Sequence, residues 1–242
     1  MERYIASAGA RLWTVASGDE PPLLLLNGSA CSDYLEPVAD MLGGRRTMIR
    51  FEPRGCGRST CDGNYDLAIS MTDLESIRAS YDVDRWVLAG HSAGPNLALA
   101  YAMYRPDTVE GIVGIAGGNF MNDRDWHRAY DDSLAAGGDQ TGDLHFDSDP
   151  EVLTQLNREW KAFIKSPDVF RRLADLTMPV SLLGAGMDIR PNWPMRQLAE
   201  LLPHGRYREI PGAGHYPWLT HPDAVAAGLN EALDYVQSRA VK

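Results

Sequence analysis

The fold is decided by residues 85–104, which read RWVLAGHSAGPNLALAYAMY. The run opens with apolar residues from Trp86 to Ala89, enough for one buried strand of a parallel sheet. It then passes through a serine between glycines, Ser92, into a stretch rich in Leu and Ala, which favour helix. A strand, a tight turn with a central serine and a helix together are typical of a nucleophile elbow.

Gly90 and Gly94 flank this serine for a steric reason. Because so tight a turn brings the strand and helix backbones together, we expect a Cβ at either position to collide. Pro95 follows in the first turn of the expected helix, where a missing N–H does no harm. The helix N-terminus then points at Ser92 and favours negative charge there. The sequence therefore predicts a nucleophilic serine rather than a bystander in a glycine-rich loop.

Composition limits the class of protein. The chain has 242 residues, 44% of them hydrophobic, and a formal net charge of −10. This length is typical of one α/β domain with a full core. The negative charge argues against nucleic acid and anionic membranes as partners. No apolar run approaches the length of a membrane span, and the N-terminus lacks the pattern of a signal peptide.

The three cysteines form neither a disulfide framework nor a metal-binding pattern. We interpret Cys31, Cys56 and Cys61 as reduced thiols, which predicts a cytoplasmic location. Between its glycine neighbours, Cys56 is expected to be a small packed residue rather than a second nucleophile.

Apolar strand patterns alternate with helical patterns along most of the chain. The expected strands are residues 3–7, 11–17, 23–26, 46–51, 86–89, 109–116, 180–184 and 207–210. This alternation predicts an α/β fold with a mostly parallel sheet and helices on both faces. In such folds, sites form beyond the C-terminal ends of the strands.

The alternation of strand and helix patterns stops at residues 117–177, where no strand is expected and helical pieces occur around residues 126–130 and 153–163. Since this segment is too long for a simple connection, we predict a helical lid inserted into a core formed by residues 1–116 and 178–242. Trp126, Tyr130, Trp160 and Phe163 are expected either to line an acyl pocket or to join the lid to the body.

The expected lid is also acidic, because residues 129–157 contain no Lys or Arg. The acidic residues are Asp131, Asp132, Asp139, Asp143, Asp147, Asp149 and Glu151. They could attract a cationic substrate, but a solvated acidic loop is the preferred interpretation.

A serine hydroxyl is too weak an acid to attack an ester unaided, so it needs a histidine base oriented by a carboxylate. In this kind of fold the chain order is Ser, acid, His. Asp188 follows a late strand and His215 follows the last one, so both are predicted to reach Ser92. Asp123, after the preceding strand, remains the alternative acid.

Other polar residues receive less weight. Ser29 and Ser32 are alternative hydroxyls, but neither follows a strand into a helix as Ser92 does. His91 is expected to pack inside the elbow rather than titrate. The oxyanion hole is predicted to use two backbone N–H groups, from Ala93 and from Ser29 in the loop after residues 23–26.

The motifs together resemble the α/β-hydrolase superfamily across nearly the whole chain. They are the Gly90–Gly94 turn, Asp188, Gly214-His215 and the loop Arg54-Gly55-Cys56-Gly57-Arg58-Ser59. That loop is similar to the one in prolyl iminopeptidases and their esterase-like relatives, although Arg54 and Arg58 are interpreted as anchors near Glu52 rather than an anion site. Prolyl iminopeptidases show H-G-G-P-G where this chain has Asn27-Gly28-Ser29-Ala30-Cys31.

The resemblance implies a serine hydrolase that acts on a small-molecule acyl substrate, such as a carboxylic ester, without a metal or an organic cofactor. A prolyl iminopeptidase-like aminopeptidase is the first alternative. A small-molecule receptor built on the same fold is the second.

Overall fold

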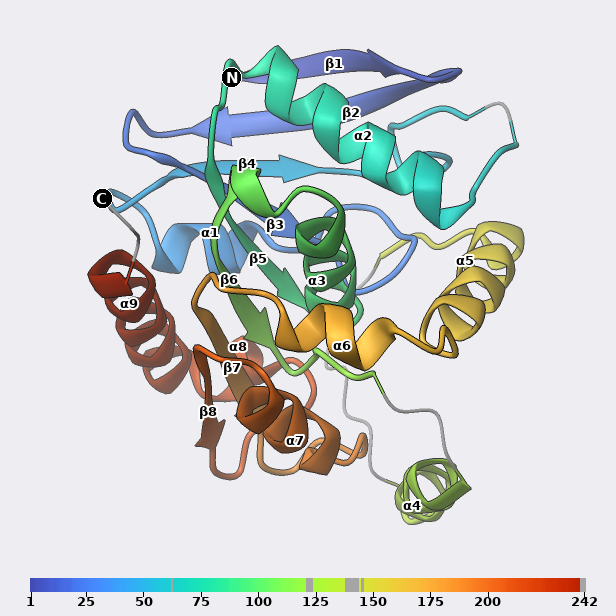
Figure 1. Cartoon of the computed structure of the whole chain (residues 1–242), viewed down its shortest axis with the longest axis vertical. Helices are drawn as coiled ribbons and strands as arrows, with labels where there is room; N and C mark the ends of the chain where they lie inside the picture. Colours follow the sequence, from blue (N-terminus) through green and yellow to red (C-terminus); the bar gives the residue numbers. More distant parts are fainter. Residues whose placement is uncertain (62, 121–123, 138–143, 145, 240–242) are drawn as a thin grey trace.

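The computed structural model describes residues 1–61, 63–120, 124–137, 144 and 146–239, and one eight-stranded sheet forms its centre (Figure 1). The strand order across the sheet is β1-β2-β4-β3-β5-β6-β7-β8. The strands are β1 (Glu2–Ser7), β2 (Ala10–Ser17), β3 (Pro22–Leu26), β4 (Thr47–Phe51), β5 (Trp86–His91), β6 (Val109–Ile115), β7 (Val180–Ala185) and β8 (Gly205–Ile210). The α/β fold with a mostly parallel sheet is confirmed.

One strand runs against the others. β2 is antiparallel to both of its neighbours, β1 and β4, whereas the pairs from β4 to β8 are parallel. β1 and β2 form a hairpin whose turn passes through Ala8 and Gly9, both with positive φ. The parallel strands therefore end at the same edge of the sheet, as the sequence predicts.

Helices cover both faces of the sheet (Figure 1). They are α1 (Glu36–Met41), α2 (Leu67–Ser80), α3 (Gly94–Tyr104), α4 (Arg124–Ala135), α5 (Pro150–Phe163), α6 (Val169–Ala174), α7 (Trp193–Leu201), α8 (Pro217–Thr220) and α9 (Pro222–Arg239), with a short 3₁₀ helix at Pro106–Thr108.

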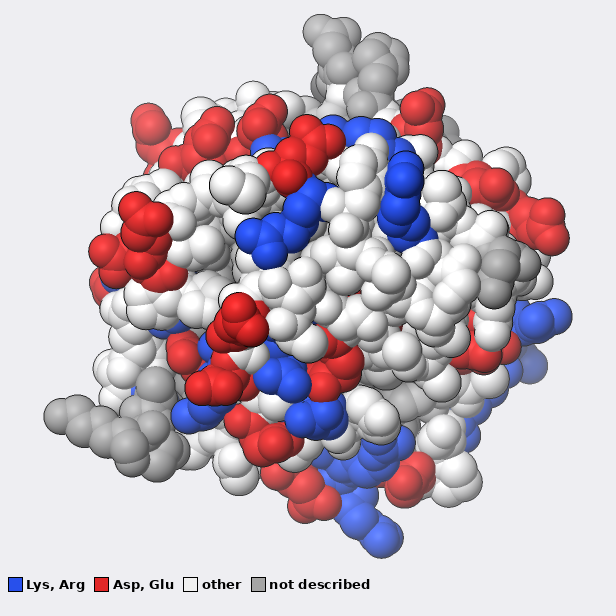
Figure 2. Space-filling model, turned by 90° about the horizontal axis from the view of Figure 1, so that it is seen from above, with Lys and Arg blue, Asp and Glu red and all other residues white. Residues whose placement is uncertain are grey.

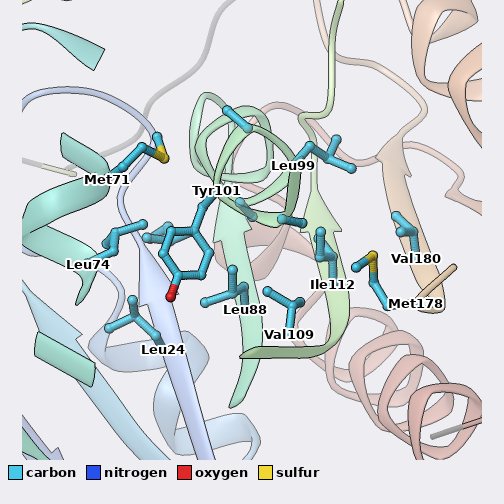
Figure 3. Close-up of a cluster of buried hydrophobic side chains, with 14 of the residues drawn as sticks. Leu24, Met71, Leu74, Leu88, Leu99, Tyr101, Val109, Ile112, Met178 and Val180 are labelled. Carbon is cyan, nitrogen blue, oxygen red and sulfur yellow. The ribbon is translucent and has the colours of Figure 1, made fainter. Parts of the chain in front are cut away.

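The strand side chains divide between two cores. In β3, Leu24 and Leu26 join the core beneath α2 and α3, whereas Leu23 and Leu25 join the core beneath α1 and α9. Figure 3 shows part of the first core, in which Tyr101 of α3 lies among side chains from α2 and the central strands. Burying each large apolar side chain stabilises the fold by roughly 1.5–3 kcal/mol. Two buried faces explain why the central strands are apolar throughout.

Residues 117–177 contain the helices α4, α5 and α6. α5 contacts α2, and α6 contacts α3. None of the described residues of α4 is buried. The helical pieces expected from the sequence around residues 126–130 and 153–163 fall within α4 and α5. Their role as a lid stays a prediction.

Figure 2 shows basic and acidic side chains interspersed on the face that it draws. Within the described residues, no helix has both the length and the apolar character needed to cross a membrane.

Candidate active site

The turn after β5 has the geometry of the predicted elbow. Ser92 has a φ of +56°, a backbone conformation that few non-glycine residues adopt. A Cβ added at Gly90 would lie 2.8 Å from the carbonyl carbon of Gly94, and one at Gly94 would lie 2.4 Å from the oxygen of Leu26. Both distances are shorter than real contacts, so these positions require glycine. The turn is also tied to β6, because the backbone N–H of Ser92 donates to the oxygen of Ile115 at 2.9 Å.

The structure brings Ser92, His215 and Asp188 together in one line of hydrogen bonds. The Oγ of Ser92 lies 3.0 Å from Nε2 of His215. The Nδ1 of His215 lies 2.6 Å from Oδ2 of Asp188. Asp188 follows β7 and His215 follows β8, so adjacent parallel strands deliver the two side chains to the same edge. His215 is 3% exposed, and the contact therefore lies out of solvent.

The surroundings of Asp188 keep it ionised. Burial raises the pKa of its carboxyl, but the hydrogen bond and charge of His215 and donors from Arg190 lower it by more, so the pKa lies below its usual value. The other oxygen of Asp188 accepts from the backbone N–H of Arg190 at 2.9 Å and from its guanidinium at 3.3 Å. An ionised, doubly held carboxylate fixes which nitrogen of His215 carries the proton.

The two predicted oxyanion donors lie at one cavity, but one of them is engaged. Ala93 and Ser29 both line this cavity. The backbone N–H of Ala93 donates to the oxygen of Gly28 at 3.1 Å. A substrate oxygen would have to replace Gly28 as the acceptor.

The cavity beside the elbow has a volume of about 140 Å³ and a mainly apolar lining. Its walls come from the loops after β3 and β4 and from α2, α3 and α5. The lining residues include Asn27, Phe51, Leu67, Leu74, Leu97, Leu153, Leu156 and Trp160. No local pattern marks the α2 side chains as part of the site, because their spacing is that of any helix packed on a sheet.

The two arginines of the loop after β4 form ion pairs. Arg58 lies over the ring of Trp13 and binds Glu52, with Nη2 at 2.7 Å from Oε1. Arg54 instead pairs with Asp73 of α2 through two hydrogen bonds of 2.7 and 2.6 Å, and both side chains are buried. The predicted anchoring at Glu52 therefore applies to Arg58, whereas Arg54 anchors the loop to α2.

Burial raises the pKa of the Cys56 thiol to about 12. A thiol with so high a pKa stays protonated at neutral pH, which fits a packed residue. All three cysteines are free thiols.

The aromatic residues expected near the site separate into different roles. Trp160 lines the cavity, and Phe163 packs against Trp160 and Phe120 in the core. Trp126 and Tyr130 stack on each other within α4, with ring centroids 5.5 Å apart.

Of the acidic residues, Asp149 caps α5 by accepting from Glu151 and Val152. Asp139 and Asp143 lie outside the described residues, as does Asp123, the alternative acid.

The chain belongs to the α/β-hydrolase family. The model of that family matches residues 23–228, which include every strand from β4 to β8 and all three residues of the Ser92–His215–Asp188 line.

Individual relatives differ in what they do. The chain is 33% identical over 101 residues to a proline iminopeptidase of Xylella fastidiosa, covering 38% of this chain and 31% of the relative. It is 25% identical over 225 residues to a putative carbamate hydrolase, RutD, of Yersinia enterocolitica, covering 78% of each chain. Among solved structures, an esterase from Thermogutta terrifontis superposes with a TM-score of 0.78 at 20% identity, covering 98% of this chain and 99% of the esterase. The family is hydrolytic, and the structural likeness shows the fold.

Proposed function

We propose that the protein is a serine hydrolase that cleaves a small carboxylic ester or a related acyl compound. The observation that carries the proposal is the hydrogen-bonded line from Ser92 through His215 to Asp188, with contacts of 3.0 and 2.6 Å. Such a line makes a serine nucleophilic, because the imidazole accepts its proton and the carboxylate stabilises the imidazolium that forms.

The proposed reaction has two halves. Ser92 attacks the carbonyl carbon while His215 takes the hydroxyl proton, and His215 then gives that proton to the leaving group. A water molecule next attacks the acyl-enzyme with His215 as the base, which releases the acid and restores Ser92. Asp188 orients His215 throughout and does not itself become protonated.

The oxyanion formed in each half would be held by the backbone N–H groups of Ala93 and Ser29. The substrate oxygen would take the place that the oxygen of Gly28 occupies at Ala93. The Gly28–Ser29 peptide would turn at the same time, because in a trans peptide the N–H of Ser29 points away from that oxygen. Loss of one such donor costs roughly 10²–10³ in rate. Since a backbone donor survives a side-chain change, we expect Ser29→Ala to retain activity.

The cavity supports an acyl group of modest size as the substrate. At about 140 Å³ and with mainly leucine and aromatic walls, it suits an apolar chain or ring rather than a large polar one. The relative described as a carbamate hydrolase makes carbamates a reasonable second class to assay, because they present the same kind of carbonyl.

An iminopeptidase-like aminopeptidase is the second candidate, favoured by the local identity to a proline iminopeptidase. Such an enzyme needs an acidic side chain for the substrate's amino group. Among the described residues that line the cavity, Asp73 is the one carboxylate, and both of its oxygens already accept from Arg54. This pairing favours an ester over an aminoacyl amide.

The cytoplasmic location remains part of the proposal.

Labelling with a fluorophosphonate probe tests the mechanism directly. We expect the probe to modify Ser92, as mapped by mass spectrometry, and Ser92→Ala to abolish both labelling and turnover of short acyl esters. A panel that includes proline and alanine arylamides and a carbamate then separates the substrate classes. Full esterase activity in Ser92→Ala would refute the proposal. Ligand-induced stabilisation without labelling or turnover would support a receptor instead.

A further inference from the structure

A side chain outside the proposed triad joins the Ser92 turn to the loop that carries His215. His91 is fully buried, and its Nε2 lies 2.8 Å from the backbone oxygen of His215. Its Nδ1 lies 2.6 Å from the hydroxyl of Tyr34. That hydroxyl in turn lies 2.8 Å from the backbone nitrogen of Gly28. The three contacts connect the His215 loop, the elbow and the loop after β3.

Each of these hydrogen bonds has only one possible direction. A carbonyl oxygen can only accept, so Nε2 of His91 must carry the proton. In the neutral ring Nδ1 then accepts, and the Tyr34 hydroxyl must donate to it. The oxygen of Tyr34 is left to accept from the N–H of Gly28.

Both side chains are held in the neutral form that this pattern requires. Burial, followed by the charge of His215, places the pKa of His91 well below its ordinary value. Burial likewise raises the pKa of Tyr34 well above its ordinary value. Neither group therefore changes charge near neutral pH.

We propose that Tyr34 and His91 are positioning residues that hold the Gly28–Ser29 backbone at a fixed position relative to His215. The inference rests on the hydrolase function proposed above. Gly28 is held through its N–H, which donates to Tyr34 at 2.8 Å. The next N–H along the chain is that of Ser29, the proposed oxyanion donor. Anchoring the N–H of Gly28 limits where the peptide that carries this donor can lie, and a preorganised donor is what stabilises a developing charge.

The packing around the Tyr34–His91 pair leaves it little freedom. The ring centroid of Tyr34 lies 5.2 Å from that of Phe146, and the ring stacks on Trp218 with centroids 6.2 Å apart. The ring centroid of His91 lies 4.8 Å from that of Trp218. A Cβ added at Gly28 would lie 2.4 Å from the Tyr34 hydroxyl oxygen, so the loop has room only for a hydrogen there. The pair acts on the reaction through the backbone of the two loops.

Tyr34→Phe tests the proposal, because it removes the hydroxyl and keeps the ring. We expect kcat for a short acyl ester to fall roughly 10- to 100-fold while KM changes less than about threefold. The matched control is Tyr101→Phe, which removes the hydroxyl of a buried tyrosine that contacts Glu75 and Thr108 instead. The control should lose a similar amount of thermal stability and keep kcat. If the two variants matched in both Tm and kcat, the positioning role would be refuted.

Nitrogen NMR of the histidines supplies a readout that does not depend on turnover. We expect His91 in the unmodified protein to be neutral with its proton on Nε2, and the Nδ1 resonance to shift in Tyr34→Phe. A proton on Nδ1, or a charged ring at neutral pH, would overturn the hydrogen-bond pattern. Absence of both labelling and turnover in the unmodified protein would instead refute the hydrolase function and with it the positioning role. The NMR result would still decide the hydrogen bonds.

Discussion

The elbow and α4 lie at opposite extremes of constraint within one chain. From Trp86 to His91 every residue of β5 is buried, and the turn that follows leaves no room for a Cβ at two of its positions. α4, in contrast, buries none of its described residues, and its two aromatic rings stack on each other. The proposed chemistry thus depends on a buried and closely packed part of the fold.

α5 lies between these extremes and shows what the difference means for function. It buries only Val152, yet Leu153, Leu156 and Trp160 form one wall of the cavity. A helix that packs loosely can change its side chains without disturbing the sheet. We therefore expect changes at the elbow and its loops to affect kcat, changes on α5 to affect the choice of substrate, and changes at the exposed residues of α4 to affect neither.

The largest effect should come from Asp188→Asn. The change keeps the shape of the side chain but removes the charge that selects the tautomer of His215, so kcat should fall roughly 10³–10⁴-fold. Ester hydrolysis by the purified variant measures the loss. Asp131→Asn, an exposed change on α4, should keep kcat. A tenfold loss or less in Asp188→Asn would mean that another acid orients His215.

Gly28→Ala should come next, with kcat lowered roughly 100-fold. The added Cβ would meet the Tyr34 hydroxyl oxygen at 2.4 Å and Cβ of Ser92 at 2.7 Å, and it would displace the loop that carries the proposed oxyanion donor. The matched control is Gly214→Ala, where a Cβ would meet nothing within 4 Å. Equal activity in the two variants would contradict the close fit of this loop.

Leu156→Ala tests whether α5 affects substrate binding rather than the rate of the chemical step. Removing this side chain from the cavity wall should raise KM for the best ester roughly tenfold and leave kcat within about threefold, since it removes a contact made equally in the ground state and the transition state. Leu134→Ala, on exposed α4, should leave both constants unchanged. Steady-state kinetics over a series of acyl lengths would measure the effect, and a loss confined to kcat would count against the cavity as the acyl site.

The smallest expected effect concerns stability in acid. Burial raises the pKa of Glu52, but hydrogen bonds from Arg58 and from the backbone N–H of Asp33 lower it by more, so the folded-state pKa lies below the unfolded value. The carboxylate therefore stabilises the fold above pH ~4.3, and that contribution disappears as the pH falls through the lowered pKa. Glu52→Gln should reduce the free energy of unfolding by ~1–3 kcal/mol at neutral pH and by less in acid.

Urea unfolding at several pH values would measure the Glu52→Gln difference. Asp132→Asn on α4 should stay within ~0.5 kcal/mol of the unmodified protein at each pH. A Glu52→Gln difference that grew as the pH fell would contradict the assigned direction of the pKa.

Much of the fold follows from local sequence, because the constraints that specify it are local. The turn at Ser92 needs its glycines for steric reasons, and β3 must be apolar on both sides because helices cover both faces. Asp188 and His215 were expected together because parallel strands end at one edge. The contact between Tyr34 and His91 joins residues 57 positions apart, and no local pattern indicates it. The same holds for the hydrogen bond that engages the N–H of Ala93, which depends on how two loops meet.

The order of the proposed triad along the chain has a consequence for biosynthesis. Ser92 is made 123 residues before its base, His215, and the intervening strands β6, β7 and β8 must take their places before the two can meet. A nascent chain that has left the ribosome only as far as α7 contains Ser92 and Asp188 but lacks His215, the base that connects them. On the proposed mechanism, reactivity towards the fluorophosphonate arises late in synthesis, so its onset during translation would report the moment at which the C-terminal strands dock.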